Sequence, residues 1–202
     1  AFQTIISGVP PAEQDGFIVK FSPSGSRIWC TYYGGTSGYG GEQLFSIEVG
    51  SNNNIYFAGG VGNTNLPVLN AFQSVYGGGF SDGFTGCLAG DGSTLLWATY
   101  FGGSDDDRIY GHALGQNGDV LCCGRTASDN FPVLNAQQSS RAGDGDGTVV
   151  CLSSTGQFSS TGSQIQTSAL SSSSFCAGAS LQVTFTGTGT FNSGNIFTAQ
   201  LS

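Results

Sequence analysis

Acidic residues are the side chains in this sequence best suited to chemistry, and they concentrate in two short segments. These segments are Ser104-Asp-Asp-Asp-Arg108 and Gly143-Asp-Gly-Asp-Gly147. Calcium binds several oxygen ligands on flexible loops, so either segment could supply part of a calcium site. Neither has the length or the terminal Glu of an EF-hand loop, and solvated turns are the alternative interpretation. The weak calcium candidates are Asp105, Asp106, Asp107, Asp144 and Asp146.

Other catalytic or metal-binding patterns are not recognised in the sequence. His112 is the single histidine and falls in an expected strand, where packing is the favoured role. No Gly-x-Ser-x-Gly nucleophile turn occurs in a credible context, and no acid–base pair sits in a recognisable motif. We therefore predict that the chain is not an enzyme and has no resident cofactor or metal, calcium aside.

The six cysteines predict disulfides rather than a metal knuckle, because no Cys-x-x-Cys occurs. Adjacent Cys122 and Cys123 point to opposite faces of an expected strand. Cys151 lies in the next strand, so we expect at least one disulfide that joins Cys151 to one of them. Cys87 occupies the same repeat position as Cys151 and is a further candidate.

Composition excludes several classes of partner. Charged residues make up 9% of the 202 residues, Gly accounts for 34 of them, and the net charge is −8. Nucleic acids and anionic membranes bind basic clusters, which this acidic sequence lacks. A surface built from Ser, Thr, Asn, Gln and Gly is common in secreted all-β proteins, so we expect an extracellular or cell-surface location without membrane insertion.

The sequence is organised as a repeat. Thr94-Leu-Leu-Trp-Ala-Thr-Tyr-Phe-Gly-Gly103 matches Ser26-Arg-Ile-Trp-Cys-Thr-Tyr-Tyr-Gly-Gly35, and further motifs recur at intervals of about 65 residues. Each Gly-Gly pair is expected to end its strand in a tight turn with positive φ. We assign structural roles to seven repeated positions: Asp15, Asp82, Asp146, Trp29, Trp97, Gly35 and Gly103.

Alternating apolar and polar residues predict an all-β fold with four short antiparallel strands in each repeat. That arrangement is typical of a propeller blade. Residues 1–157 would then hold the outer half of one blade, a full blade and three strands of another. Residues 158–163 are an expected linker, and residues 164–202 begin an incomplete β-sandwich.

Three motifs, Asp15-Gly-Phe-Ile-Val-Lys-Phe-Ser-Pro-Ser-Gly25, Trp29-Cys-Thr-Tyr-Tyr-Gly-Gly35 and Asn65-Leu-Pro-Val-Leu-Asn-Ala-Phe-Gln73, resemble the SBBP β-propeller repeat of secreted bacterial proteins. Residues 174–202 resemble the start of an Ig-like repeat domain of Bacteroidetes surface proteins. The two resemblances imply an exported, multi-domain protein of the cell surface or of filaments, and a type IX secretion cargo. Neither family supplies a catalytic motif.

The expected function is therefore a non-enzymatic structural or interaction module that serves adhesion, display or filament building. Its expected partners are neighbouring domains of the parent chain, other subunits or the secretion machinery. The alternative is a glycan-binding propeller, or an accessory domain of a secreted hydrolase. Tyr32, Tyr33, Tyr100 and Phe101 could stack on sugars, although their repeated positions favour packing between blades.

Overall fold

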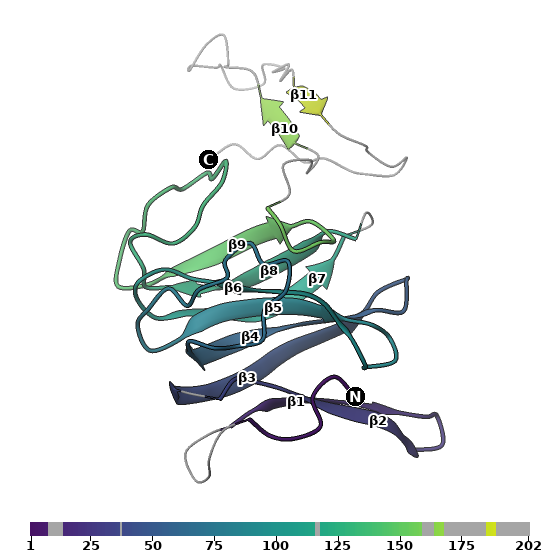
Figure 1. The fold of residues 1–202 in the computed structure, drawn as a ribbon. Helices are drawn as coiled ribbons and strands as arrows, with labels where there is room; N and C mark the ends of the chain where they lie inside the picture. Colours follow the sequence, from purple (N-terminus) through teal and green to yellow (C-terminus); the bar gives the residue numbers. More distant parts are fainter. Residues whose placement is uncertain (8–13, 37, 116–117, 159–163, 168–184, 189–202) are drawn as a thin grey trace, which may run out of the picture. The chain divides into compact units, whose positions relative to one another are not determined.

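The computed structural model describes residues 1–7, 14–36, 38–115, 118–158, 164–167 and 185–188. These residues form eleven strands in antiparallel sheets, and none of them is helical (Figure 1). The all-β class predicted from the period-2 alternation is confirmed. Within the described ranges, no helix is long and apolar enough to cross a membrane. The chain divides into two compact units, residues 1–159 and 160–202.

The first unit contains three sheets, and in each of them the strands follow one another in sequence order. The first sheet consists of β1 (Gly16–Phe21) and β2 (Arg27–Tyr33). The central sheet consists of β3 (Gly38–Val49), β4 (Ile55–Asn63), β5 (Asp82–Leu88) and β6 (Leu95–Phe101). The third sheet consists of β7 (Asp107–Leu114), β8 (Val120–Thr126) and β9 (Asp146–Leu152).

In the second unit, β10 (Gln164–Thr167) pairs antiparallel with β11 (Phe185–Thr188). The rest of the region expected to begin an Ig-like domain lies outside the described residues, as does Cys176.

The hydrophobic core lies on both faces of the central sheet, because its strands alternate apolar side chains between two clusters. Ile55 and Phe57 of β4 enter the cluster shared with the first sheet. Tyr56 and Ala58, the intervening residues, enter the cluster shared with the third sheet. Because both faces of the central sheet are covered, β4 and β5 are buried along nearly their whole length, whereas β1 and β9 also contain exposed positions.

The repeated tryptophans pack across the two contacts between sheets. A Cβ on Gly92, in the β5–β6 turn, would lie 2.7 Å from the indole of Trp29 on β2. A Cβ on Gly156, in the turn after β9, would likewise lie 2.4 Å from the indole of Trp97 on β6. Both turn glycines have positive φ, +69° for Gly92 and +78° for Gly156, so each position needs glycine for its backbone as well as for its neighbour.

Tyr100 is fully buried and joins β6 to the connection after β4. Its hydroxyl accepts the Leu66 N–H at 2.8 Å and donates to the Asn63 carbonyl at 3.1 Å. Replacement of Tyr100 by Phe would leave the buried Leu66 N–H without an acceptor. We expect Tyr100→Phe to lower the free energy of unfolding by about 1–3 kcal/mol in a urea titration. Tyr110→Phe is the matched control, because Tyr110 is 48% exposed and should tolerate the change.

Candidate functional site

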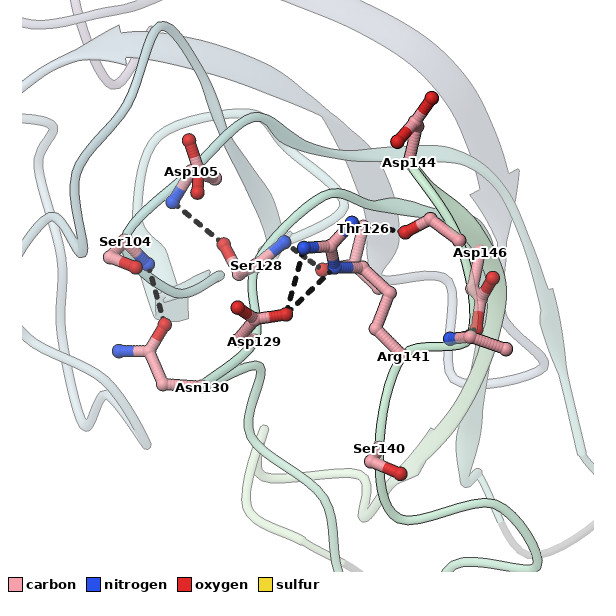
Figure 2. Close-up of polar contacts among 12 residues, drawn as sticks. Ser104, Asp105, Thr126, Ser128, Asp129, Asn130, Ser140, Arg141, Asp144 and Asp146 are labelled. Atoms are coloured by element: carbon pink, nitrogen blue, oxygen red, sulfur yellow. Dashed lines mark hydrogen bonds and ion pairs between the residues drawn. The ribbon is translucent and has the colours of Figure 1, made fainter.

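The two acidic segments lie in loops at the same end of the third sheet. Figure 2 shows that the loop after β6 and the loop between β8 and β9 are tied together by polar contacts. The Ser104 N–H donates to Asn130 Oδ1 at 2.8 Å, and the Asp105 N–H donates to Ser128 Oγ at 2.7 Å. Arg141 reaches back to Asp129 at 2.8 Å. The loops are therefore ordered chiefly by backbone and side-chain hydrogen bonds.

The first acidic segment already has protein partners for two of its carboxylates. Asp106 forms ion pairs with Arg108 at 3.5 Å and with Arg125 at 3.4 Å. Asp107 is fully buried, and its Oδ2 accepts the Gly103 N–H at 2.6 Å and the Ser128 hydroxyl at 2.7 Å. These contacts favour a structural role for Asp106 and Asp107.

The second acidic segment is also bonded within the chain. Asp146 Oδ2 accepts from Gln138 Nε2 at 2.7 Å and from the Ala142 N–H at 2.9 Å. The backbone carbonyl of Asp144 accepts from Arg125 at 3.4 Å. Among the described residues, no group of three or more His, Cys, Asp or Glu is placed to hold a metal ion. Calcium binding at these loops stays a prediction, and it would have to displace arginine from Asp106.

Asp146 shares its bonding pattern with the other two repeated aspartates. Asp82 Oδ2 accepts the Gly77 N–H at 2.6 Å and lies 3.5 Å from Gln73 Nε2. Asp15 Oδ2 accepts the Ser7 N–H at 2.7 Å and Gln3 Nε2 at 2.9 Å. Each of these aspartates therefore fixes the loop that precedes its strand. The structural role of these aspartates stays a prediction, which these contacts favour.

A glutamine is the partner of the aspartate in each of these loops: Gln3, Gln73 and Gln138. The amide of each also donates to the carbonyl two residues later, at 2.9–3.1 Å. In the first two repeats, the glutamine Oε1 accepts the N–H of the first glycine of the Gly-Gly pair. The sequence alone did not indicate a role for these glutamines.

The Gly-Gly pairs are the centre of two similar joints between successive sheets. The first joint consists of Gln14, Asp15, Gly34, Gly35 and Glu42, and the second of Ser81, Asp82, Gly102, Gly103 and Asp107. In each joint, an acidic residue on the first strand of the next sheet donates its N–H to the carbonyl of the residue before the repeated aspartate. Glu42 donates to Gln14 at 2.8 Å, and Asp107 donates to Ser81 at 2.6 Å.

The acidic side chain of each joint then binds the second glycine. The Gly35 N–H donates to Glu42 Oε1 at 2.7 Å, as the Gly103 N–H does to Asp107. The carboxylate of Glu42 also accepts from Asn63, which corresponds to Ser128 in the second joint. Sequence analysis did not identify Glu42, although its spacing from Asp107 matches the repeat.

The expected positive φ of the Gly-Gly pairs is not found, because the glycines with positive φ lie elsewhere. The reason for glycine is close approach instead. A Cβ on Gly34 would lie 2.5 Å from Asp15 Oδ1, and one on Gly103 would lie 2.5 Å from Asn130 Oδ1. Real Cβ atoms do not tolerate such distances, so both positions of each pair exclude a side chain.

Burial raises the pKa of one acidic group at each joint, Glu42 at the first and Asp82 at the second. The pKa of Asp82 is raised to about 7, first by desolvation and further by the nearby charge of Asp107, against the lowering effect of the Gly77 hydrogen bond. The pKa of Glu42 is likewise raised to about 7 by desolvation, with a smaller contribution from Asp15. These two carboxyl groups titrate near neutral pH rather than in acid.

His112 lies between the central and third sheets, where its backbone N–H donates to Ser46 Oγ at 3.2 Å. Neither imidazole nitrogen has a hydrogen-bond partner among the described residues. Desolvation lowers the pKa of His112, against a raising effect of the Glu48 charge. The ring is therefore neutral at pH 7, in agreement with the packing role expected from the sequence.

The five described cysteines are free thiols: Cys30, Cys87, Cys122, Cys123 and Cys151. The expected bond to Cys151 is not formed because the register of β8 and β9 differs by one residue from the one it requires. Cys151 lies opposite Leu121, and Val150 lies opposite Cys122. Cys123 is exposed, whereas Cys87 and Cys122 are buried.

The aromatic residues weighed as sugar platforms are mostly interior. Tyr33, Tyr100 and Phe101 are at most 1% exposed. Tyr33 stacks on Phe84 with ring centroids 5.7 Å apart, and Phe101 meets Phe131 edge to face at 5.3 Å. Packing between sheets is therefore their role in this structure.

A scan against protein-family models and a search of curated proteins both found no match. The repeated joints and the open surfaces of the first unit are thus the observations on which a function must rest.

The close approach at Gly103 gives a direct test of the second joint. We expect Gly103→Ala to lower the free energy of unfolding by roughly 1–3 kcal/mol, because the new methyl group would press on Asn130 and Ser128. Gly143→Ala is the control, since a Cβ there meets nothing within 4 Å. Equal stability of the two variants in a denaturant titration would contradict the packing argument.

Thiol labelling tests the placement of the cysteines. Burial raises the pKa of Cys87 to about 11 and that of Cys122 to about 12, which leaves little thiolate to react at pH 8. We expect iodoacetamide to modify exposed Cys123 first, and Cys87 and Cys122 only after denaturation. Peptide mass spectrometry under non-reducing conditions reads out both labelling and disulfides. A Cys122–Cys151 or Cys123–Cys151 bridge would show a different register.

Proposed function

We propose that this protein is a non-enzymatic interaction module whose sheets stack as blades of a β-propeller within a large secreted protein. The observation that carries the proposal is the repetition of the joint: equivalent residues link the first sheet to the central sheet and the central sheet to the third. The two tryptophan contacts repeat in the same order. A contact that recurs at equivalent positions from sheet to sheet is typical of an array of structural repeats.

The first and central sheets leave an apolar surface that supports further stacking. Phe45, Ile47 and Val49 of β3 are 40%, 58% and 61% exposed, and Phe17 of β1 is 64% exposed. Between them lies a groove of about 170 Å³. Its lining residues are Phe17, Ile18, Leu44, Phe45, Ser46, Ile47 and Phe57. Contiguous apolar surface of this kind marks interaction sites.

The third sheet indicates what would cover this groove. Ile47 and Val49 of β3 correspond to His112 and Leu114 of β7, and both strands have an irregularity at the same place in their pairing. The His112 and Leu114 N–H groups donate to the side chains of Ser46 and Glu48 on the preceding sheet. By repetition, the proposed partner of β3 is a β-hairpin of the same kind, with acceptor side chains facing Ile47 and Val49.

This partner would come from a neighbouring domain of the parent chain. We propose an extracellular or cell-surface location and a role in adhesion, display or filament building. The sequence resemblances alone support this location and this role. They are also the only support for type IX secretion and for an Ig-like fold of the second unit. The alternative of glycan binding loses support because Tyr33, Tyr100 and Phe101 are buried.

Docking can be tested with the chain's own β3–β4 hairpin. A labelled peptide of residues 38–63 should bind the protein saturably, as measured by fluorescence anisotropy. Ile47→Lys in the protein should weaken binding roughly tenfold or more, because a charge would enter the apolar contact. Val75→Lys is the control, since Val75 is 70% exposed and is not among the residues that line the groove. Equal affinities for the two variants, or specific binding on a glycan array, would argue against the proposal.

A further inference from the structure

Each joint brings two acidic side chains to the same glycine pair, and none of the four forms an ion pair with a described residue. In the second joint, a Cβ on Gly102 would lie 2.6 Å from Asp82 Oδ1 and 3.0 Å from Asp107 Oδ2, so the two carboxyl groups meet there. Both residues are fully buried. Oδ1 of each has no hydrogen-bond partner among the described residues.

The charged groups around this pair do not neutralise it. Arg108 and Arg125 both pair with Asp106 rather than with the buried carboxyl groups. Tyr76 and Tyr100 also face Asp82, and burial raises the pKa of each to about 12, so both are neutral near pH 7. Two adjacent buried carboxylates are costly to ionise together.

The first joint repeats this arrangement. Glu42 is 4% exposed and interacts electrostatically with Asp15, whose Oδ1 is a buried atom with no hydrogen-bond partner among the described residues. The other titratable groups near Glu42 are Tyr33 and Tyr100, and burial raises the pKa of both. Among the described residues, Asp146 of the third sheet has no such acidic partner, and its carboxylate binds Gln138 and the Ala142 N–H.

We propose that each joint holds a proton on its pair of carboxyl groups, so that the contact between successive sheets is a pH-sensitive element that weakens as the pH rises through neutrality. One protonated carboxyl group donates to its neighbour and leaves a single negative charge in each joint. Loss of the proton leaves two like charges in a buried site, which pushes the sheets apart.

The direction of the pH effect follows from the raised pKa values. In the unfolded chain, Asp82 and Glu42 titrate near 3.8 and 4.5, and in the folded chain both titrate near 7. The folded protein therefore binds more protons than the unfolded chain between about pH 4 and pH 7. Stability contributed by these groups is complete at the acidic end of this window and is lost as the pH rises through 7. His112, whose pKa is lowered, acts in the opposite sense in acid.

The test uses amides as permanent mimics of the protonated groups. Asp82→Asn keeps an acceptor for the Gly77 N–H and places an amide donor where Asp82 meets Asp107. Glu42→Gln does the same beside Asp15. We expect the midpoint of thermal unfolding of the natural protein to fall by several degrees from pH 5 to pH 8. In each single variant, the midpoint should decrease by only about half as much between pH 5 and pH 8. In the double variant it should hardly decrease at all. Asp91→Asn, in an exposed turn, should keep the full fall.

Carboxyl ¹³C NMR of the natural protein provides a second measurement that does not depend on whether a variant folds. Titration of Asp82 with a midpoint near 7 is the expected result. A midpoint near its ordinary value would overturn the proposal, as would a double variant with the same pH dependence as the natural protein. Stabilisation at pH 8 by Ca²⁺ or Mg²⁺ that is lost in Asp82→Asn would also overturn it, because the pair would then hold a cation.

Discussion

The packing of the first unit depends on one interaction, the hydrogen bond from a Gly-Gly amide to an acidic side chain of the next sheet. Gly35 donates to Glu42, and Gly103 donates to Asp107. Because the glycines lack side chains, the carboxyl groups can approach the backbone closely enough to exclude water. A hydrogen bond to a charged acceptor is stronger than one between neutral groups, but burial of the charge offsets part of the gain. The joint therefore combines tight geometry with an electrostatic cost.

Local sequence patterns predicted the strands of the first unit well, because successive side chains of a strand point to opposite faces and so give a period of two. The apolar run of β4 reflects burial on both faces, whereas the alternating apolar residues of β3, Phe45, Ile47 and Val49, lie on its exposed face. The repeated aspartates were likewise recognisable, because their hydrogen bonds are to residues nearby in sequence. Trp29 and Trp97 were assigned structural roles, although the sequence alone did not indicate that they pack on the turn glycines Gly92 and Gly156.

Relations that depend on register or on distant parts of the chain were not predictable in the same way. The disulfide to Cys151 failed on a difference of one residue in the β8–β9 pairing, which no periodicity specifies. The Gly-Gly pairs were correctly expected at the ends of strands, but the reason is a side chain that approaches from elsewhere, not the backbone angle. Glu42 was overlooked because its partner, Gly35, belongs to the preceding sheet.

The tryptophan contact gives the stack a polarity. Each contact uses an indole from one sheet and a turn glycine from the following sheet, so the two surfaces that meet are different. Such a contact is heterologous: a two-fold axis cannot generate it, and every added sheet must face the same way. The rotation from one sheet to the next then decides the outcome geometrically. If the rotation between successive sheets is a whole-number fraction of 360° without a shift along the axis, the array closes into a ring. Otherwise it continues as an open helix.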